Sequence, residues 1–383
     1  MRISQMQRRE PFEALLIQTL ERGWSEQFGM TVRVTAPGDG WRVQPLISAF
    51  FTAQVNGEAR RYMRDSFRYT PIQSRAAAQW VLGTALASKI GLKLSSRPGF
   101  DVSPQIPNAD AMVIIPGNQR IRVLDFSTKR CRVFLKEGFD SATMANEIRL
   151  RGSGDSGPFP PITSAADNAS WFEEALLDAY ALPRCPPGID KGLCEKEALN
   201  LLEEWQRDSR RSADAKDYST QLLAKAQQDL AMVCDRFGNH WEALKSLLDT
   251  LAKLGSHGTV ELSQSHGDFQ AGNIMVNRKD ADVTLIDWEH SAERTHLYDR
   301  MVNGLKSRAS KGLAERVKNA LQRDLPGVRV NGQTMALFLL EDLAWFLRES
   351  LTGPFAMVSE GLVQYRREVE SLGNLNTLLS GGS

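Results

Sequence analysis

The stretch HGDFQAGNIM, residues 266–275, decides how the rest of the chain is interpreted. It places His266 and Asp268 on either side of a glycine, and Asn273 follows five residues after the aspartate. Phosphoryl transfer needs a carboxylate that accepts the proton of an attacking hydroxyl. An amide oxygen close to that carboxylate is a hard ligand suited to Mg²⁺. The spacing is therefore typical of a segment that holds a proton acceptor and a metal ligand together.

A second pattern follows at VTLIDWEH, residues 283–290, where an apolar run ends in Asp287. An acidic residue at the end of a strand can hold a metal ion against the oxygens of a phosphate. Either pattern alone is common in loops and at strand ends, but their joint occurrence at this spacing predicts a phosphotransferase.

The two segments together resemble the catalytic segments of the aminoglycoside phosphotransferase and choline kinase-like family, a branch of the protein kinase-like fold. The resemblance implies that Asp268 is the catalytic base and that Asn273 and Asp287 bind Mg²⁺. It also implies that His266 braces the loop and that Asp299, in the following stretch WEHSAERTHLYDR, has a structural role. ATP is the expected phosphoryl donor, and GTP remains open.

The periodicity along the chain agrees with an α+β, bilobal protein kinase-like fold, in which a small antiparallel β lobe precedes a large helical lobe. Apolar runs at 111–115, 121–126 and 131–135 are separated by PGNQR and STKR, which predicts a three-stranded antiparallel meander. Helices are predicted over 11–24, 71–91, 141–151, much of 195–253, 312–323, 333–351 and 355–372.

Three domains are predicted along the chain. The segment 95–110 is dense in Pro, Ser and Gly, which is typical of a linker, so residues 1–108 are expected to form an accessory N-terminal α/β domain. Residues 109–176 would form the kinase-like N-lobe with its hinge, and residues 177–383 the helical C-lobe. The family pattern covers approximately residues 111–370.

The resemblance also predicts a lysine and a partner acid in the β lobe, because a phosphate-binding lysine needs a carboxylate to position it. Lys136 ends the third strand of the predicted meander, and Glu147 follows eleven residues later in the predicted helix. We expect these two residues to form an ion pair at the nucleotide.

Two further segments are assigned to the nucleotide at the level of the fold. The turn PGNQR contains Gly117 and Asn118, whose backbone amides are candidate phosphate donors, although a protein kinase GxGxxG is absent. The backbone around Glu174 and Leu176, in the predicted hinge, is the candidate partner of the purine.

The acceptor is expected to be a hydroxyl of a small molecule, such as a sugar, an aminoglycoside or an amino alcohol. In the family that the chain resembles, the acceptor binds to the helical lobe, often against acidic residues. Candidate acids there are Glu289, Glu341, Asp342 and Glu349. The surrounding sequence FLLEDLAWFLRES has an apolar face, so packing is the favoured role of this helix, and an acceptor contact of Glu341 or Asp342 is the alternative.

The composition of the chain indicates the cellular compartment and the kinds of site to expect. The chain has 383 residues, with 47 Lys and Arg against 46 Asp and Glu, and four cysteines without a CxxC pair. This usage suggests neither a zinc site nor a disulfide framework. We expect a cytoplasmic protein with no membrane span and no nucleic-acid partner, and the oligomeric state stays open.

Two alternatives remain beside the small-molecule kinase. Residues 1–100 contain 14 basic and 7 acidic residues, which would suit a kinase that acts on a sugar of an acidic cell-surface glycan, such as a lipopolysaccharide or a capsule. The other alternative is a nucleotide-binding regulator without catalysis. A protein kinase is disfavoured, because the glycine-rich loop and an APE-like segment are both absent from the sequence.

Overall fold

The computed structural model describes residues 3–68, 76–152, 157–237, 241–309, 311–351 and 360–380. It is an α+β structure whose chain divides into two compact units. Unit 1 comprises Met1–Glu195 and Ile274–Ile286, and unit 2 comprises Lys196–Asn273 and Asp287–Ser383. The two predicted motifs fall mainly in unit 2, while the predicted nucleotide lysine falls in unit 1.

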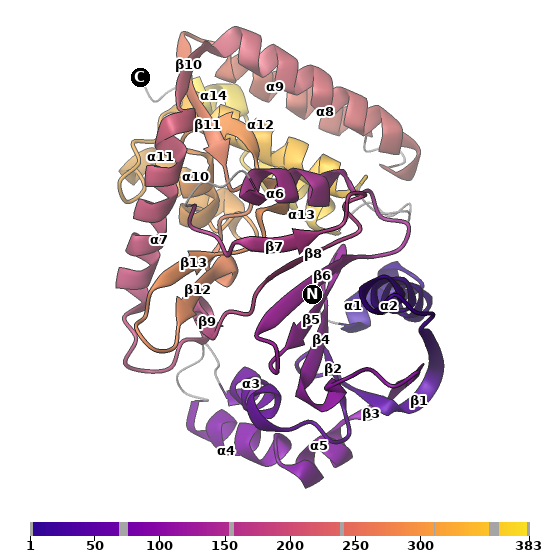
Figure 1. Ribbon diagram of the computed structural model, residues 1–383. Helices are drawn as coiled ribbons and strands as arrows, with labels where there is room; N and C mark the ends of the chain where they lie inside the picture. Colours follow the sequence, from indigo (N-terminus) through magenta and orange to yellow (C-terminus); the bar gives the residue numbers. More distant parts are fainter. Residues whose placement is uncertain are drawn as a thin grey trace. The chain divides into compact units, whose positions relative to one another are not determined.

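Unit 1 is built on an eight-stranded antiparallel sheet in the order β3-β1-β2-β4-β5-β6-β8-β7 (Figure 1). The predicted meander is confirmed as β4, β5 and β6, in which Ile114 lies opposite Val123 and Ile121 lies opposite Phe134. The strands are β1 (Arg33–Gln44), β2 (Ala49–Thr52), β3 (Arg97–Ser103), β4 (Met112–Pro116), β5 (Arg120–Asp125), β6 (Arg130–Leu135), β7 (Ile162–Ala165) and β8 (Trp171–Ala175).

The sheet continues through the predicted domain boundary at residue 108. Strand β2 pairs with β4 through Phe50 and Ile114, so three strands from the first 108 residues extend the sheet of the meander. The predicted linker contains β3 and the short helix Ala109–Ala111. The boundaries of the compact units lie elsewhere, and a separate N-terminal domain is therefore not shown.

Helices cover the two faces of this sheet differently. On one face, α1 (Ile3–Arg9) and α2 (Phe12–Phe28) form an apolar core with Phe134 and Ile121. Helix α2 lies so close to the sheet that a Cβ on Gly23 would lie 2.4 Å from the Phe134 ring. On the other face, charged side chains of α6 (Ala142–Gly152) reach the sheet, and Arg151 lies over the ring of Phe172.

The remaining elements of unit 1 are not part of the eight-stranded sheet. The predicted helix 71–91 is observed as two helices, α4 and α5, because the chain breaks at residues 87–88, where Ser88 caps α5; residues 71–75 lie outside the described part of the chain. A small sheet of order β13-β12-β9 completes the unit. These elements are α3 (Gly57–Arg68), α4 (Ala76–Leu86), α5 (Lys89–Ser95), β9 (Ala179–Ala181), β12 (Ile274–Asn277) and β13 (Val283–Leu285).

Unit 2 is mostly helical, as predicted, with one small sheet of order β10-β11-β14. Helices α8 and α9 lie side by side (Figure 1). The elements are α7 (Lys191–Gln206, which begins in unit 1), α8 (Ala215–Phe237), α9 (Trp241–Gly255), α10 (Tyr298–Gly304), α11 (Leu313–Arg323), α12 (Gly332–Glu349), α13 (Glu360–Glu370), α14 (Leu375–Ser380), β10 (Arg211–Asp214), β11 (Thr259–Ser265) and β14 (Ala292–Thr295).

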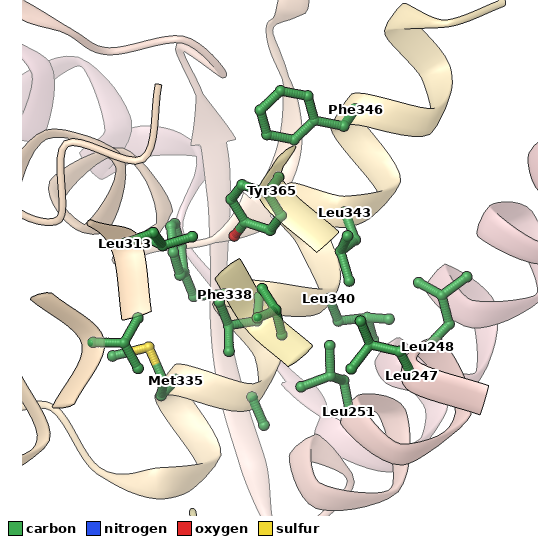
Figure 2. Close-up of a cluster of buried hydrophobic side chains, with 14 of the residues drawn as sticks. Leu247, Leu248, Leu251, Leu313, Met335, Phe338, Leu340, Leu343, Phe346 and Tyr365 are labelled. Carbon is green, nitrogen blue, oxygen red and sulfur yellow. The ribbon is translucent and has the colours of Figure 1, made fainter. Parts of the chain in front are cut away.

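Helix α12 forms the centre of unit 2. Figure 2 shows Leu340 and Leu343 of α12 in one apolar cluster with Leu247 and Leu251 of α9. Because α12 is surrounded by other helices, even its charged residues in the middle of the helix are buried. None of the described helices is both long enough and apolar enough to cross a membrane.

Candidate functional site

The predicted catalytic loop directly follows strand β11 in unit 2. Gly267 adopts a φ of +89°, which favours glycine. A Cβ at this position would lie 2.1 Å from the carbonyl oxygen of His290. The loop can therefore lie this close to the backbone of His290 only if residue 267 has no side chain. The glycine of the HGD pattern is thus required by the local backbone.

A buried aspartate holds the backbone of this loop. Asp299, at the start of α10, accepts the amide N–H of His266 at 2.7 Å through Oδ2 and that of Gly267 at 2.9 Å through Oδ1. Burial raises the pKa of Asp299, although the electrostatic interaction with His266 and the two amide hydrogen bonds oppose the shift. The predicted structural role of Asp299 is confirmed by these contacts.

The predicted brace also lies beside the loop. The ring nitrogen Nδ1 of His266 accepts the amide N–H of Asp268 at 3.3 Å. The His266 ring packs against Trp288, with 4.5 Å between the ring centroids. Trp288 belongs to the second motif, so the two motifs of the sequence are in contact around this histidine.

Three donors hold the carboxylate of Asp268, whose side chain is 16% exposed. Its Oδ2 accepts hydrogen bonds from Gln270 Nε2 at 2.8 Å and from Asn273 Nδ2 at 3.1 Å. Its Oδ1 accepts a hydrogen bond from Arg308 Nε at 2.8 Å. The asparagine five residues after the aspartate is thus in contact with it, and Arg308 is a neighbour that the sequence did not indicate.

The donor set of the two predicted metal ligands fits Mg²⁺. The amide nitrogen of Asn273 donates to the backbone carbonyl of Asp268 at 2.9 Å, and these donor bonds leave the Asn273 carbonyl oxygen as the ligand atom. Asp287 follows β13 with a φ of +67°, a conformation that non-glycine residues adopt mainly where the surroundings require it. The described residues contain no cluster of three or more His, Cys, Asp or Glu that could hold a metal ion. Mg²⁺ suits such a site, because it is usually bound by one or two protein oxygens together with water and phosphate oxygens.

Two of the predicted acceptor residues are instead part of the helical core. Glu341 is 1% exposed and accepts hydrogen bonds from the Thr295 amide at 2.6 Å and from the Tyr218 hydroxyl at 2.5 Å. Burial raises the pKa of Glu341 to about 7. Asp342 is fully buried and accepts from the Tyr298 hydroxyl at 2.8 Å. The structure therefore corrects the expectation that these two acids contact the acceptor.

The other two predicted acids lie on either side of a histidine. His290 Nε2 lies 3.5 Å from Glu289 Oε1 and 3.4 Å from Glu349 Oε1, and both acids are partly exposed. Burial alone would lower the pKa of His290, but the hydrogen bond to Glu289 and the charges of Glu349 and Asp268 raise it overall. The ring of Trp345 lies 5.0 Å from that of His290. This acidic and aromatic group belongs to the same unit as Asp268.

In unit 1, the predicted ion pair of Lys136 and Glu147 does not form. Lys136 Nζ instead lies 2.5 Å from Glu10 Oε1, and both side chains are 0% exposed. Lys136 also donates to the carbonyl oxygen of Asn118 at 3.1 Å, and Phe12 lies beside it. The partner of the lysine thus comes from the junction between α1 and α2.

Glu147 is engaged in a different charged group. Its Oε1 accepts from Arg151 Nη1 at 2.6 Å, and its Oε2 pairs with Arg120. Arg151 also pairs with Glu174. Both arginines lie over the ring of Phe172, at 5.9 Å for Arg120 and 5.1 Å for Arg151. Arg120 and Arg151 thus bind the Glu147 carboxylate that was predicted to pair with Lys136.

The alternation of side chains along β6 explains this difference. Successive residues of a strand point to opposite faces. Phe134 and Lys136 therefore share the face covered by α1 and α2. Val133 points to the other face, where it lies opposite Phe172 and where α6 places Glu147. Lys136 and Glu147 are close in sequence but belong to opposite faces of the sheet.

Two of the backbone amides assigned to the nucleotide, those of Gly117 and Leu176, already have partners, while the contacts at Asn118 involve its carbonyl and leave the prediction for its amide untested. The Gly117 amide donates to the Arg120 carbonyl at 2.7 Å, and the Asn118 carbonyl accepts from Arg9 at 2.7 Å as well as from Lys136. In the predicted hinge, the Leu176 amide donates to the Lys129 carbonyl at 2.9 Å. Residue 174 lies inside β8, which pairs with β6 and β7 on its two sides. The structure therefore does not support the predicted purine contacts of Glu174 and Leu176.

Comparison with known proteins bears on the segment that carries the motifs. Residues 190–302 match the family model described as choline/ethanolamine kinase. This segment includes Asp268, Asn273 and Asp287, and it excludes Lys136 and Glu147. The chain matches no curated protein.

Several solved structures are similar to the chain at low identity. Choline kinase LicA from Streptococcus pneumoniae is 15% identical with a TM-score of 0.43, and the match covers 70% of this chain and 91% of that chain. Plasmodium vivax ethanolamine kinase is 11% identical with a TM-score of 0.44, covering 86% and 97%. Aminoglycoside 2′-phosphotransferase-IIIa, solved as its GDP complex, is 14% identical with a TM-score of 0.42, covering 67% and 91%. The segment that carries the HGD and LIDWE motifs is thus similar to choline/ethanolamine kinases, the family that these motifs resemble.

Proposed function

We propose that this protein is a nucleotide-dependent kinase that transfers a phosphoryl group to a hydroxyl of a small molecule, within a protein kinase-like fold. The observation that carries the proposal is the catalytic loop of unit 2. There, Asp268 and Asn273 are in direct contact, and Asp299 fixes the backbone on the N-terminal side. A carboxylate held next to an amide oxygen is the arrangement that orients a hydroxyl and a metal-bound phosphate.

Each residue of this loop has a role in the proposed reaction. Asp268 accepts the proton of the acceptor hydroxyl. The hydroxyl oxygen then bonds to phosphorus, and the nucleoside diphosphate leaves. Asn273 and Asp287 would hold Mg²⁺, which offsets the negative charge of the phosphate oxygens when bound. ATP is the proposed donor, with GTP as the alternative. Lys136 carries no part of the proposal, because its side chain is fully buried against Glu10.

The charges of unit 2 favour a cationic acceptor, such as an amino alcohol or an aminoglycoside. Glu289 and Glu349 are partly exposed, and both belong to the group of side chains around His290 and Trp345. Carboxylates beside an aromatic ring are suited to bind an ammonium group. Neutral sugars lack the charge that these two acids would recognise.

Phosphoryl transfer to a panel of acceptors tests the proposal. The panel contains choline, ethanolamine, aminoglycosides and neutral sugars, each with ATP or GTP and with Mg²⁺ or a chelator. We expect Asp268→Ala to lower kcat by roughly 100-fold or more, because general base catalysis is worth about 10²–10⁴-fold. Asp280→Ala, in an exposed turn of unit 1, is the matched control and is expected to retain activity.

Two variants test the acceptor class separately. Glu289→Gln and Glu349→Gln should each raise KM for a cationic acceptor about tenfold, the loss expected for one charge-assisted contact, and leave KM for the nucleotide unchanged. Unchanged KM values in both variants would contradict the cationic acceptor without affecting the kinase reaction.

One observation favours a second candidate, the nucleotide-binding regulator. The predicted ion pair of Lys136 and Glu147 is replaced by two separate charged groups on opposite faces of the sheet. Nucleotide binding by the wild-type protein, without transfer to any acceptor in the panel, would support the regulator and contradict the kinase.

A further inference from the structure

Arg308 belongs to neither motif, but its guanidinium reaches the catalytic loop from the segment after α10. Its Nε donates to Asp268 Oδ1 at 2.8 Å, and its Nη1 donates to Asp342 Oδ1 at 2.6 Å. Its Nη2 donates to the Gly267 carbonyl at 3.2 Å and to the Tyr298 hydroxyl at 3.1 Å. All three nitrogens are thus used by protein groups, so Arg308 is not available as a direct substrate contact.

The surroundings of Arg308 hold it in one orientation. Its side chain is 10% exposed, and the guanidinium lies 3.9 Å from the centroid of the Trp345 ring. Asp342, its second carboxylate partner, is fully buried in α12, the central helix of unit 2. An exposed ion pair contributes little because both side chains are mobile. A planar guanidinium fixed by stacking and by a buried carboxylate has a defined geometry.

The fixed guanidinium of Arg308 in turn orients the carboxylate of Asp268. Arg308 holds Oδ1, while Gln270 and Asn273 hold Oδ2, so donors on both oxygens fix the plane of the carboxylate. Each carboxylate oxygen can accept more than one hydrogen bond, and the bound Asp268 therefore retains the capacity to accept one from an acceptor hydroxyl. Arg308 also holds the carbonyl of Gly267, the residue before Asp268.

We propose that Arg308 is a positioning residue, which connects the catalytic Asp268 to the buried Asp342 and keeps the carboxylate in the orientation that receives the acceptor proton. The inference rests on the proposed function, because an oriented base matters only if Asp268 takes part in transfer. Asp342 thereby has a function different from the predicted acceptor contact: it anchors the arginine from the core of unit 2.

Kinetics of the full-length protein test this role. Arg308→Ala should lower kcat by about 10–100-fold. This range is typical when a residue that orients a metal ligand through a hydrogen bond is replaced. KM for the nucleotide should change little. Arg308→Lys should recover part of kcat, because an ammonium group can pair with one carboxylate but lacks the planar fork. Arg316→Ala is the matched control: Arg316 binds the Leu305 and Lys311 carbonyls of the same segment and does not touch Asp268.

A double variant separates positioning from a purely structural role. If Arg308 acts through Asp268, adding Arg308→Ala to Asp268→Asn should cause almost no further loss, since residues that act as a unit are not additive. Independent losses that multiply in the double variant would overturn the proposal. So would an Arg308→Ala protein, folded by circular dichroism, whose kcat stays within about twofold of the Arg316→Ala control. Failure of the proposed function looks different, because the wild-type protein itself would then transfer no phosphoryl group.

Discussion

Replacement of Glu10 by Gln should destabilise the protein strongly, because it removes the only carboxylate in contact with Lys136 among the described residues. Lys136 Nζ lies 2.5 Å from Glu10 Oε1, and neither side chain is exposed. The lysine would retain the Asn118 carbonyl at 3.1 Å and the apolar rings of Phe12 and Phe139. Breaking a buried ion pair from one side costs about 3–5 kcal/mol, and we expect a loss of that size.

The loss should depend on pH in a defined direction. Burial lowers the pKa of Lys136 from its ordinary value of 10.5 to about 8, although Glu10 opposes this shift. Without Glu10 the pKa falls further. Above the folded-state pKa the native lysine is neutral, while the unfolded chain still binds the proton up to about pH 10.5. The unfolded state then binds more protons, so stability rises with pH, and the deficit of Glu10→Gln should be smaller at pH 9 than at pH 7.

Urea unfolding at pH 7 and pH 9 measures both effects. The control is Glu13→Gln, which removes an exposed carboxylate three residues away, in α2, and should change stability by less than about 0.5 kcal/mol. The double variant Glu10→Gln with Lys136→Met should recover much of the loss, because it leaves no buried charge. Equal stability of the Glu10→Gln and Glu13→Gln proteins at pH 7 would refute the reasoning.

Two further predictions concern unit 2. Glu341 has a folded-state pKa raised to about 7 by burial, against 4.5 ordinarily, so its stabilising contribution is present below pH 4.5 and is lost as pH rises through about 7. Glu341→Gln should therefore remove on the order of 3 kcal/mol of pH dependence from the unfolding free energy, and an unchanged dependence between pH 5 and pH 8 would contradict this. Gly267→Ala should lower kcat by about 100-fold, since its Cβ would lie 2.1 Å from the His290 carbonyl oxygen and must displace the loop. Wild-type kcat in a folded Gly267→Ala protein would show that the loop tolerates the shift.

Much of the fold could be predicted because it follows from local periodicity. The meander alternates apolar residues with turns of polar residues, and β4, β5 and β6 appear where these runs lie. The helices of unit 2 likewise follow their apolar spacing. The sequence could not show that β2 pairs with β4, because that pairing joins Phe50 to Ile114 across five intervening elements.

The contacts of the candidate site likewise differ in how far they could be predicted from the sequence. Asp268 and Asn273 are five residues apart and make contacts within one loop, so the motif alone brings them together. Arg308 reaches Asp268 from forty residues away, and no local pattern distinguishes it from other arginines.

Two of the failed site assignments have different physical causes. Order along the chain suggested that Lys136 and Glu147 pair, but chain order does not tell which face of the sheet each residue occupies. Helical periodicity left Glu341 and Asp342 ambiguous, because it cannot reveal that neighbouring elements bury the middle of α12 on the side that carries these two acids.

The continuity of the eight-stranded sheet limits what truncation can reveal about residues 1–108. Their removal would turn β4 into an edge strand and expose the apolar side chains of β5 and β6 that α2 covers. Exposed edges with apolar side chains promote aggregation. A shortened chain would therefore precipitate or misfold for reasons unrelated to any ligand, and point substitutions in the intact protein are the sounder route to the role of its first hundred residues.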